Sequence, residues 1–130
     1  MNFHTLCTLG FWVTGLFGLG FVLAPGLVLS LYGIGPVEGA LALMSRYFGA
    51  ALLAYAAAIL AARRLTSPVQ QRAAAPWLSV VQVAGLLISL EAVLAGTTNA
   101  MGWSTVLIYG FFFVAWGRLA LAPSATAQTA

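Results

Sequence analysis

Residues 63–72 read RRLTSPVQQR, and they hold three of the seven charged side chains of the chain, between two long apolar stretches. Within them, Ser67, Pro68 and Gln70 have the order typical of a helix start: a capping serine, a proline in the first turn and a glutamine three residues after the cap. We therefore predict a charged turn that joins two apolar helices. The charged residues outside this turn are Glu38, Arg46, Glu91 and Arg118.

The composition of the chain is that of an integral membrane protein. Its 130 residues are enough for one domain, and 62% of them are hydrophobic while only 5% are charged. About a quarter of the residues in soluble proteins are charged, so this chain has too few to form a polar shell. The net charge of +3 comes from arginines that form no basic stripe, and no nucleic-acid partner is predicted.

The inventory of reactive side chains is small. The single cysteine, Cys7, cannot form an internal disulfide or a multi-cysteine metal site, and the single histidine, His4, cannot supply both axial ligands of a bis-histidine haem. A serine–histidine–aspartate arrangement is excluded because the chain has no aspartate. We therefore predict no cofactor, no metal site and no enzymatic activity.

Four apolar segments are each close to the roughly 20 residues that a helix needs to cross a bilayer. Backbone groups in lipid must pair within their own segment, which favours helices. We predict an all-α, transmembrane four-helix antiparallel bundle that forms one domain over residues 1–122, followed by a disordered tail over residues 123–130. A cleaved signal peptide is the alternative for the first segment, but its full length and the lack of a preceding arginine or lysine favour a retained helix. The four segments are residues 5–24, 40–62, 77–95 and 102–121.

The connection between the first two segments is itself apolar. Pro25-Gly26 and residues 33–36 are strong helix breakers, and the residues between them are too few to cross a membrane. We predict a short interfacial or re-entrant segment here. An irregular apolar loop that packs on the helix ends is the alternative.

The arginines also predict the orientation in the membrane. Cytoplasmic loops carry an excess of basic residues, so the turn at residues 63–72 is expected inside. Both termini are then cytoplasmic, and the expected location is a bacterial inner membrane. The residues that set this topology are Arg63, Arg64, Arg72 and Arg118.

Arg46 and Glu91 are the two charges that lie well inside apolar segments. On antiparallel neighbouring helices they would reach a similar depth near the outer face, with Tyr109 and Asn99 close by. Ionisable groups at membrane depth are candidates for function because an unpaired charge is costly there. Three interpretations stay open: a structural ion pair, a polar pocket for a small ligand, lipid headgroup or quinone-like molecule, and a proton-coupled carboxylate.

Small residues at four-residue spacing predict close helix packing in lipid. They occur in the first segment at Gly10, Thr14 and Gly18, and in the second at Ala50, Ala54, Ala58 and Ala62. The spacing alone does not decide whether these seams join helices of one chain or of neighbouring chains.

Three stretches resemble small four-helix bacterial membrane proteins of the broadly DoxX-like group. They read FVLAPGLVLSLYG (residues 21–33), SRYFGAALL (residues 45–53) and GTTNAMGW (residues 96–103). The resemblance implies four helices with both ends inside and an arginine near the start of the second helix, here Arg46. It adds little about function, because most members of such families lack an assigned activity.

Two functions follow as hypotheses. The first is a structural or accessory subunit that packs against itself or against a larger membrane complex, with the lipid bilayer as its surroundings. The alternative is a carrier or binding protein for a lipid or another small hydrophobic ligand, built on the polar cluster around Arg46 and Glu91. A dry, directly bonded pair would favour the first, and a wet cavity that touches Arg46, Glu91 and Tyr109 would favour the second.

Overall fold

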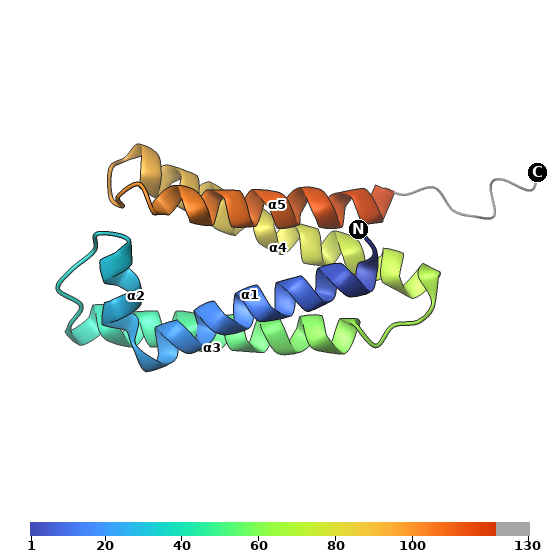
Figure 1. Ribbon diagram of the computed structural model, residues 1–130, viewed down its shortest axis with the longest axis horizontal. Helices are drawn as coiled ribbons and strands as arrows, with labels where there is room; N and C mark the ends of the chain where they lie inside the picture. Colours follow the sequence, from blue (N-terminus) through green and yellow to red (C-terminus); the bar gives the residue numbers. More distant parts are fainter. Residues whose placement is uncertain (122–130) are drawn as a thin grey trace, which may run out of the picture.

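The structure, a computed structural model, describes residues 1–121 and forms five α-helices over that range, without a strand (Figure 1). The all-helical prediction is therefore confirmed. The predicted tail at residues 123–130 lies outside the described residues. The helices are α1 (Phe3–Leu23), α2 (Pro25–Leu31), α3 (Gly39–Ala62), α4 (Pro68–Leu94) and α5 (Gly102–Leu121).

Four of these helices, α1, α3, α4 and α5, are long and apolar enough to cross a membrane, so the chain is a multi-pass membrane protein with a four-helix bundle. Each predicted segment coincides with one of them, although the first and third segments extend one residue past the ends of α1 and α4. The helix α4 begins at Pro68 with Ser67 as its N-cap residue, as the turn sequence predicted, although the serine side chain donates or accepts no capping hydrogen bond. The first part of the apolar connection is the short helix α2, and residues 32–38 follow it as a turn and irregular chain.

The four long helices form two antiparallel pairs that lie one over the other. The helix α1 packs on α3, and α4 packs on α5 (Figure 1). The end of the bundle that carries α2 is called the α2 end below. The opposite end, where α1 begins and α5 finishes, is called the terminal end.

Within the first pair, α1 and α3 cross at two glycines. A methyl group on Gly49 would lie 2.8 Å from the Gly18 carbonyl oxygen and 2.8 Å from Phe21 Cβ. This close approach is the packing that the small residues of the first segment predicted. The alanines Ala50, Ala54 and Ala58 of α3 lie on the exposed face instead.

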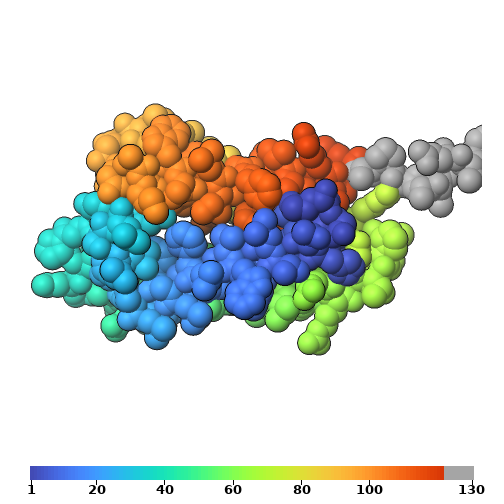
Figure 2. Space-filling model, in the orientation of Figure 1, coloured from blue at the N-terminus to red at the C-terminus, as the bar shows by residue number. Residues whose placement is uncertain are grey.

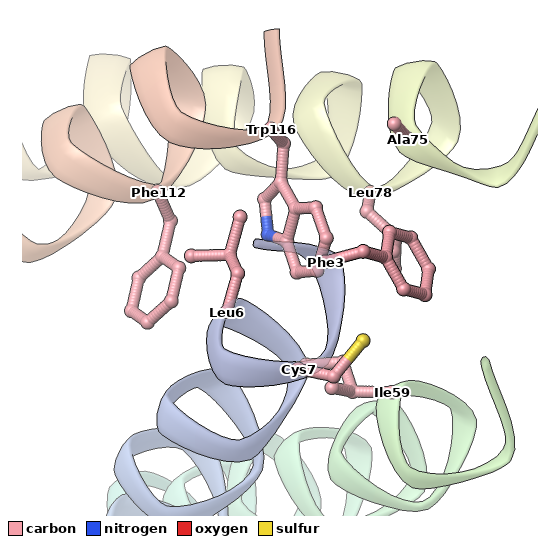
Figure 3. Packing of buried hydrophobic residues seen from close by; sticks show 8 residues of the cluster. All are labelled: Phe3, Leu6, Cys7, Ile59, Ala75, Leu78, Phe112 and Trp116. Atoms are coloured by element: carbon pink, nitrogen blue, oxygen red, sulfur yellow. The ribbon is translucent and has the colours of Figure 1, made fainter. Parts of the chain in front are cut away.

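A buried apolar cluster joins the two pairs at the terminal end (Figure 3). The indole of Trp116 is fully buried and meets the Phe3 ring edge-on, with 5.6 Å between the ring centroids. All four long helices contribute to the cluster, so it fixes the pairs to each other at this end. Its buried members are Phe3, Leu6, Cys7, Ile59, Ala75, Leu78, Phe112 and Trp116.

Hydrogen bonds join the pairs at the α2 end. The Asn99 backbone amide donates to the Tyr32 carbonyl (2.9 Å), and the Asn99 side-chain amide donates to the Leu31 carbonyl (3.0 Å). Gly33 follows with a φ of 77°, a conformation that favours glycine, and it lies against the Asn99 side chain. We call this contact the Asn99 clamp. It ties α2 to the turn between α4 and α5.

A tight turn presents Asn99 to α2. Gly96 has a φ of 70°. Its amide donates to the Val93 carbonyl (3.1 Å), and the Thr97 amide donates to the Ala92 carbonyl (2.9 Å). This pair of bonds is the Schellman motif, which ends α4 and turns the chain toward α5.

Candidate functional site

Between the two ends, the helix pairs form a half-open cavity of about 570 Å³ that is lined by residues of all five helices. The space-filling view shows the seam between α1 and α5, and the surface is hollowed there beside α2 (Figure 2). Along α5 the cavity runs from Gly102 to Phe112, a rise of roughly 15 Å at 1.5 Å per residue. Phe112 also belongs to the buried cluster, so the cluster forms one limit of the cavity.

The walls are mostly apolar. On one side they consist of side chains from α1 and α3, and on the other of side chains from α4 and α5. Such walls favour an apolar ligand, and the volume lies within the roughly 300–1,000 Å³ of small-molecule sites. The larger apolar side chains include Val13, Phe17, Phe21, Phe48, Leu52, Ile88 and Ile108.

A hydrogen-bonded group of polar side chains links α3 to α4 in the wall. Gln82 is only 5% exposed, and its Nε2 donates to the Tyr55 hydroxyl at 2.8 Å. The Tyr55 hydroxyl donates to the Leu78 carbonyl at 3.3 Å. The other terminal atom of the Gln82 carboxamide has no hydrogen-bond partner within residues 1–121. One half of this buried amide is therefore free to pair with a bound molecule.

Tyr109 projects from α5 into the same cavity. Its ring covers Gly85 of α4, where a methyl group would overlap the ring. In the described part of the chain its hydroxyl takes part in no hydrogen bond. Gly85 lies one turn from Gln82 on α4, so the Tyr109 ring and the Gln82 carboxamide are neighbours along the cavity wall.

Two further polar atoms lack partners near the limits of the cavity. Thr98 Oγ1, at the α2 end, and Trp116 Nε1, in the terminal cluster, are both buried without a hydrogen bond among the described residues. By contrast, Thr105 Oγ1 donates to the Tyr32 hydroxyl at 3.0 Å. This bond joins α5 to the end of α2, next to the Asn99 clamp.

The predicted polar cluster is only partly assembled. Tyr109 lines the cavity, and Asn99 forms the clamp at its α2 end. Arg46 and Glu91 are exposed and do not line the cavity, and no ion pair joins them within residues 1–121. The structure therefore shows neither a directly bonded pair nor a cavity that touches both charges.

The four arginines that were predicted to set the topology all lie at the terminal end. Arg63 caps the end of α3, Arg64 follows in the turn, Arg72 lies in the first turns of α4, and Arg118 lies in the last turn of α5.

The sequence analysis did not identify Gln82 and Tyr55 because it selected candidate site residues by their charge, and both of these side chains are neutral. A signal was present, since a glutamine in an apolar span must find a partner inside the bundle or a cavity. The described residues hold no group of three histidine, cysteine or acidic side chains that could bind a metal ion.

We compared the chain with family models, with curated proteins and with solved structures, and nothing matched in any of the three. The resemblance to the DoxX-like group therefore stays a prediction. The function is therefore inferred from the cavity.

Proposed function

We propose that this protein binds one small hydrophobic molecule in the cavity between its two helix pairs, as a binding protein or carrier of a bacterial inner membrane. The observation that carries the proposal is an apolar cavity of about 570 Å³ whose wall contains hydrogen-bonding groups without partners. An unpaired amide or hydroxyl in an apolar environment costs roughly 2–7 kcal/mol. A bound molecule that fills the cavity avoids this cost when it pairs with Gln82 and Tyr109.

The proposal includes an orientation with both termini in the cytoplasm. It is supported by the four arginines at the terminal end, because basic residues are retained on the cytoplasmic side. The cavity then lies in the outer half of the membrane. It needs no chemical step, since none of its described lining residues forms a nucleophile–base pair.

Native mass spectrometry of the protein released from nanodiscs tests the proposal. The wild-type chain is expected to carry one bound small molecule, and Ala51→Phe is expected to lose it, because Ala51 lines the cavity and the added ring would fill it. Ala54→Phe is the matched control, since Ala54 is exposed on the same helix and outside the cavity. If wild type and Ala51→Phe bind equally, or if nothing binds to either, the proposal is wrong.

The accessory-subunit hypothesis is supported by a different observation. Ala50, Ala54 and Ala58 form an exposed stripe on α3, and small residues in lipid permit close approach of another helix. Disulfide crosslinking of Ala54→Cys in membranes tests this role. A Cys7→Ala background removes the native thiol. Crosslinking to a second copy or to another membrane protein supports an accessory role, and a chain that stays uncrosslinked contradicts it.

A further inference from the structure

We infer that the ligand is an uncharged amphiphile: an apolar body with one hydrogen-bonding head group, such as a hydroxyl, ester or amide, that lies against Gln82 and Tyr109. This inference rests on the proposed function and names the chemical class that the cavity selects. It depends on three features of the wall: the charge of the lining residues, the position of the unpaired groups and their hydrogen-bonding capacity.

The first feature is the absence of charge. None of the described residues that line the cavity is an arginine, a glutamate or a histidine. Arg46 and Glu91 are the charged residues of α3 and α4 nearest the α2 end, and both lie outside the lining. A charged head group would lose its hydration without gaining a counter-ion, which strongly disfavours its binding. The cavity therefore selects against phosphate, carboxylate and ammonium heads.

The second feature is where the unpaired groups lie. The Gln82 carboxamide is held by its bond to Tyr55, so its free terminal atom has a fixed position in the wall. The Tyr109 hydroxyl also lacks a partner within residues 1–121, and its ring is fixed over Gly85, one turn along α4. Both groups belong to the wall of the same cavity, about one helical turn apart, and that wall is otherwise mostly apolar.

The third feature is the kind of hydrogen bond on offer. A tyrosine hydroxyl both donates and accepts, and a carboxamide has a donating and an accepting end. A hydroxyl, ester or amide head can pair with such groups without carrying a charge. From the head, the apolar body would extend along the phenylalanines of α1 and α3 toward α2, among them Phe21 and Phe48.

Three probes with the same alkyl chain test the inference: 1-dodecanol, the anion dodecanesulfonate and the cation dodecyltrimethylammonium. Native mass spectrometry of the protein in nanodiscs measures the apparent Kd of each one-to-one adduct. We expect dodecanol to bind at least about tenfold more tightly than either ion, because the ions lose hydration without compensation.

Two variants test where the head lies. Gln82→Leu and Tyr109→Phe are each expected to weaken dodecanol binding about fivefold to tenfold, as the loss of one buried hydrogen bond predicts. Their matched controls are Gln70→Leu at the exposed start of α4 and Tyr47→Phe on the exposed face of α3, which should leave the Kd unchanged. Tyr109→Phe removes a single oxygen atom, so it remains informative if Gln82→Leu fails to fold.

The outcomes separate this inference from the function it rests on. If either ion binds as tightly as dodecanol, the selectivity is wrong while the binding function stands. If dodecanol is preferred but both variants bind it normally, the head does not lie against Gln82 and Tyr109, and the inference is also wrong. If no probe forms an adduct and Ala51→Phe matches wild type in its native adducts, the proposed function itself fails.

Discussion

Gly49 and Gly18 lie where α1 crosses α3, and Gly49 has no room for a side chain. A methyl group at Gly49 would lie 2.8 Å from Phe21 Cβ and from two backbone atoms of α1, which move only if the helix moves. We expect Gly49→Ala to lower the free energy of unfolding by about 1–3 kcal/mol, the usual range for overpacking. Titration with dodecyl sulfate in mixed micelles, followed by circular dichroism, measures this change.

Gly26→Ala is the matched control for this substitution. A methyl group at Gly26, in α2, would meet no atom within 4 Å. Equal unfolding free energies for the two variants would show that the glycine crossing does not limit the packing of α1 on α3.

Arg46 and Glu91 allow a second residue-scale prediction. Both side chains are exposed, and no ion pair joins them among the described residues. We therefore expect Arg46→Gln and Glu91→Gln to be additive, with a coupling free energy within about 0.5 kcal/mol of zero. A double-mutant cycle of unfolding free energies measures the coupling. A coupling well above this value would restore the structural ion pair that the sequence suggested.

At the scale of elements, the Asn99 clamp determines how firmly α2 covers the cavity. Asn99→Ala removes the side-chain bond to the Leu31 carbonyl and a second bond from the Met101 amide. Each is worth about 1 kcal/mol, so we expect amide exchange in α2 and in residues 97–101 to become about fivefold faster or more. Hydrogen-exchange mass spectrometry measures both segments.

Asn2→Ala is a matched control at the opposite end of the bundle. The Asn2 side chain caps α1 by accepting from the Thr5 amide at 2.8 Å. Its loss should affect the start of α1 and leave α2 unchanged. If Asn99→Ala and Asn2→Ala alter exchange in α2 to the same degree, the clamp does not hold that helix.

The elements themselves could be predicted from the sequence, but their partners could not. Apolar length defines a span, and the Ser67-Pro68 pair marks the start of α4. Pairing depends on which face of each helix meets which neighbour. The glycines of α1 and the alanines of α3 give the same small-residue signal, yet Gly18 is buried and Ala54 is exposed. A single sequence does not distinguish these faces.

The cavity could not be predicted from the sequence for a related reason. It is a property of two helix pairs that meet at both ends, through the terminal cluster and the Asn99 clamp. Its polar group pairs Tyr55 of α3 with Gln82 of α4, two residues far apart in sequence. Charge guided the prediction to Arg46 and Glu91, whereas neutral side chains line the space.

At the scale of the whole molecule, the arginines at the terminal end should decide the orientation in the membrane. Phosphatase and fluorescent-protein reporters fused after residue 130 are expected to report a cytoplasmic C-terminus. The test variant has serine in place of all four arginines of that end, which removes its excess of basic residues; they are Arg63, Arg64, Arg72 and Arg118. The same variant carries added lysines at residues 97–100, so that the basic excess lies at the α2 end. Because retained basic residues set the topology, we expect this variant to insert in both orientations or in the inverted one.

Arg46→Ser is the control, since Arg46 lies toward the other end of α3 and its replacement should leave the reporters unchanged. A periplasmic C-terminus in the unaltered chain would contradict the orientation and place the cavity in the inner half of the membrane.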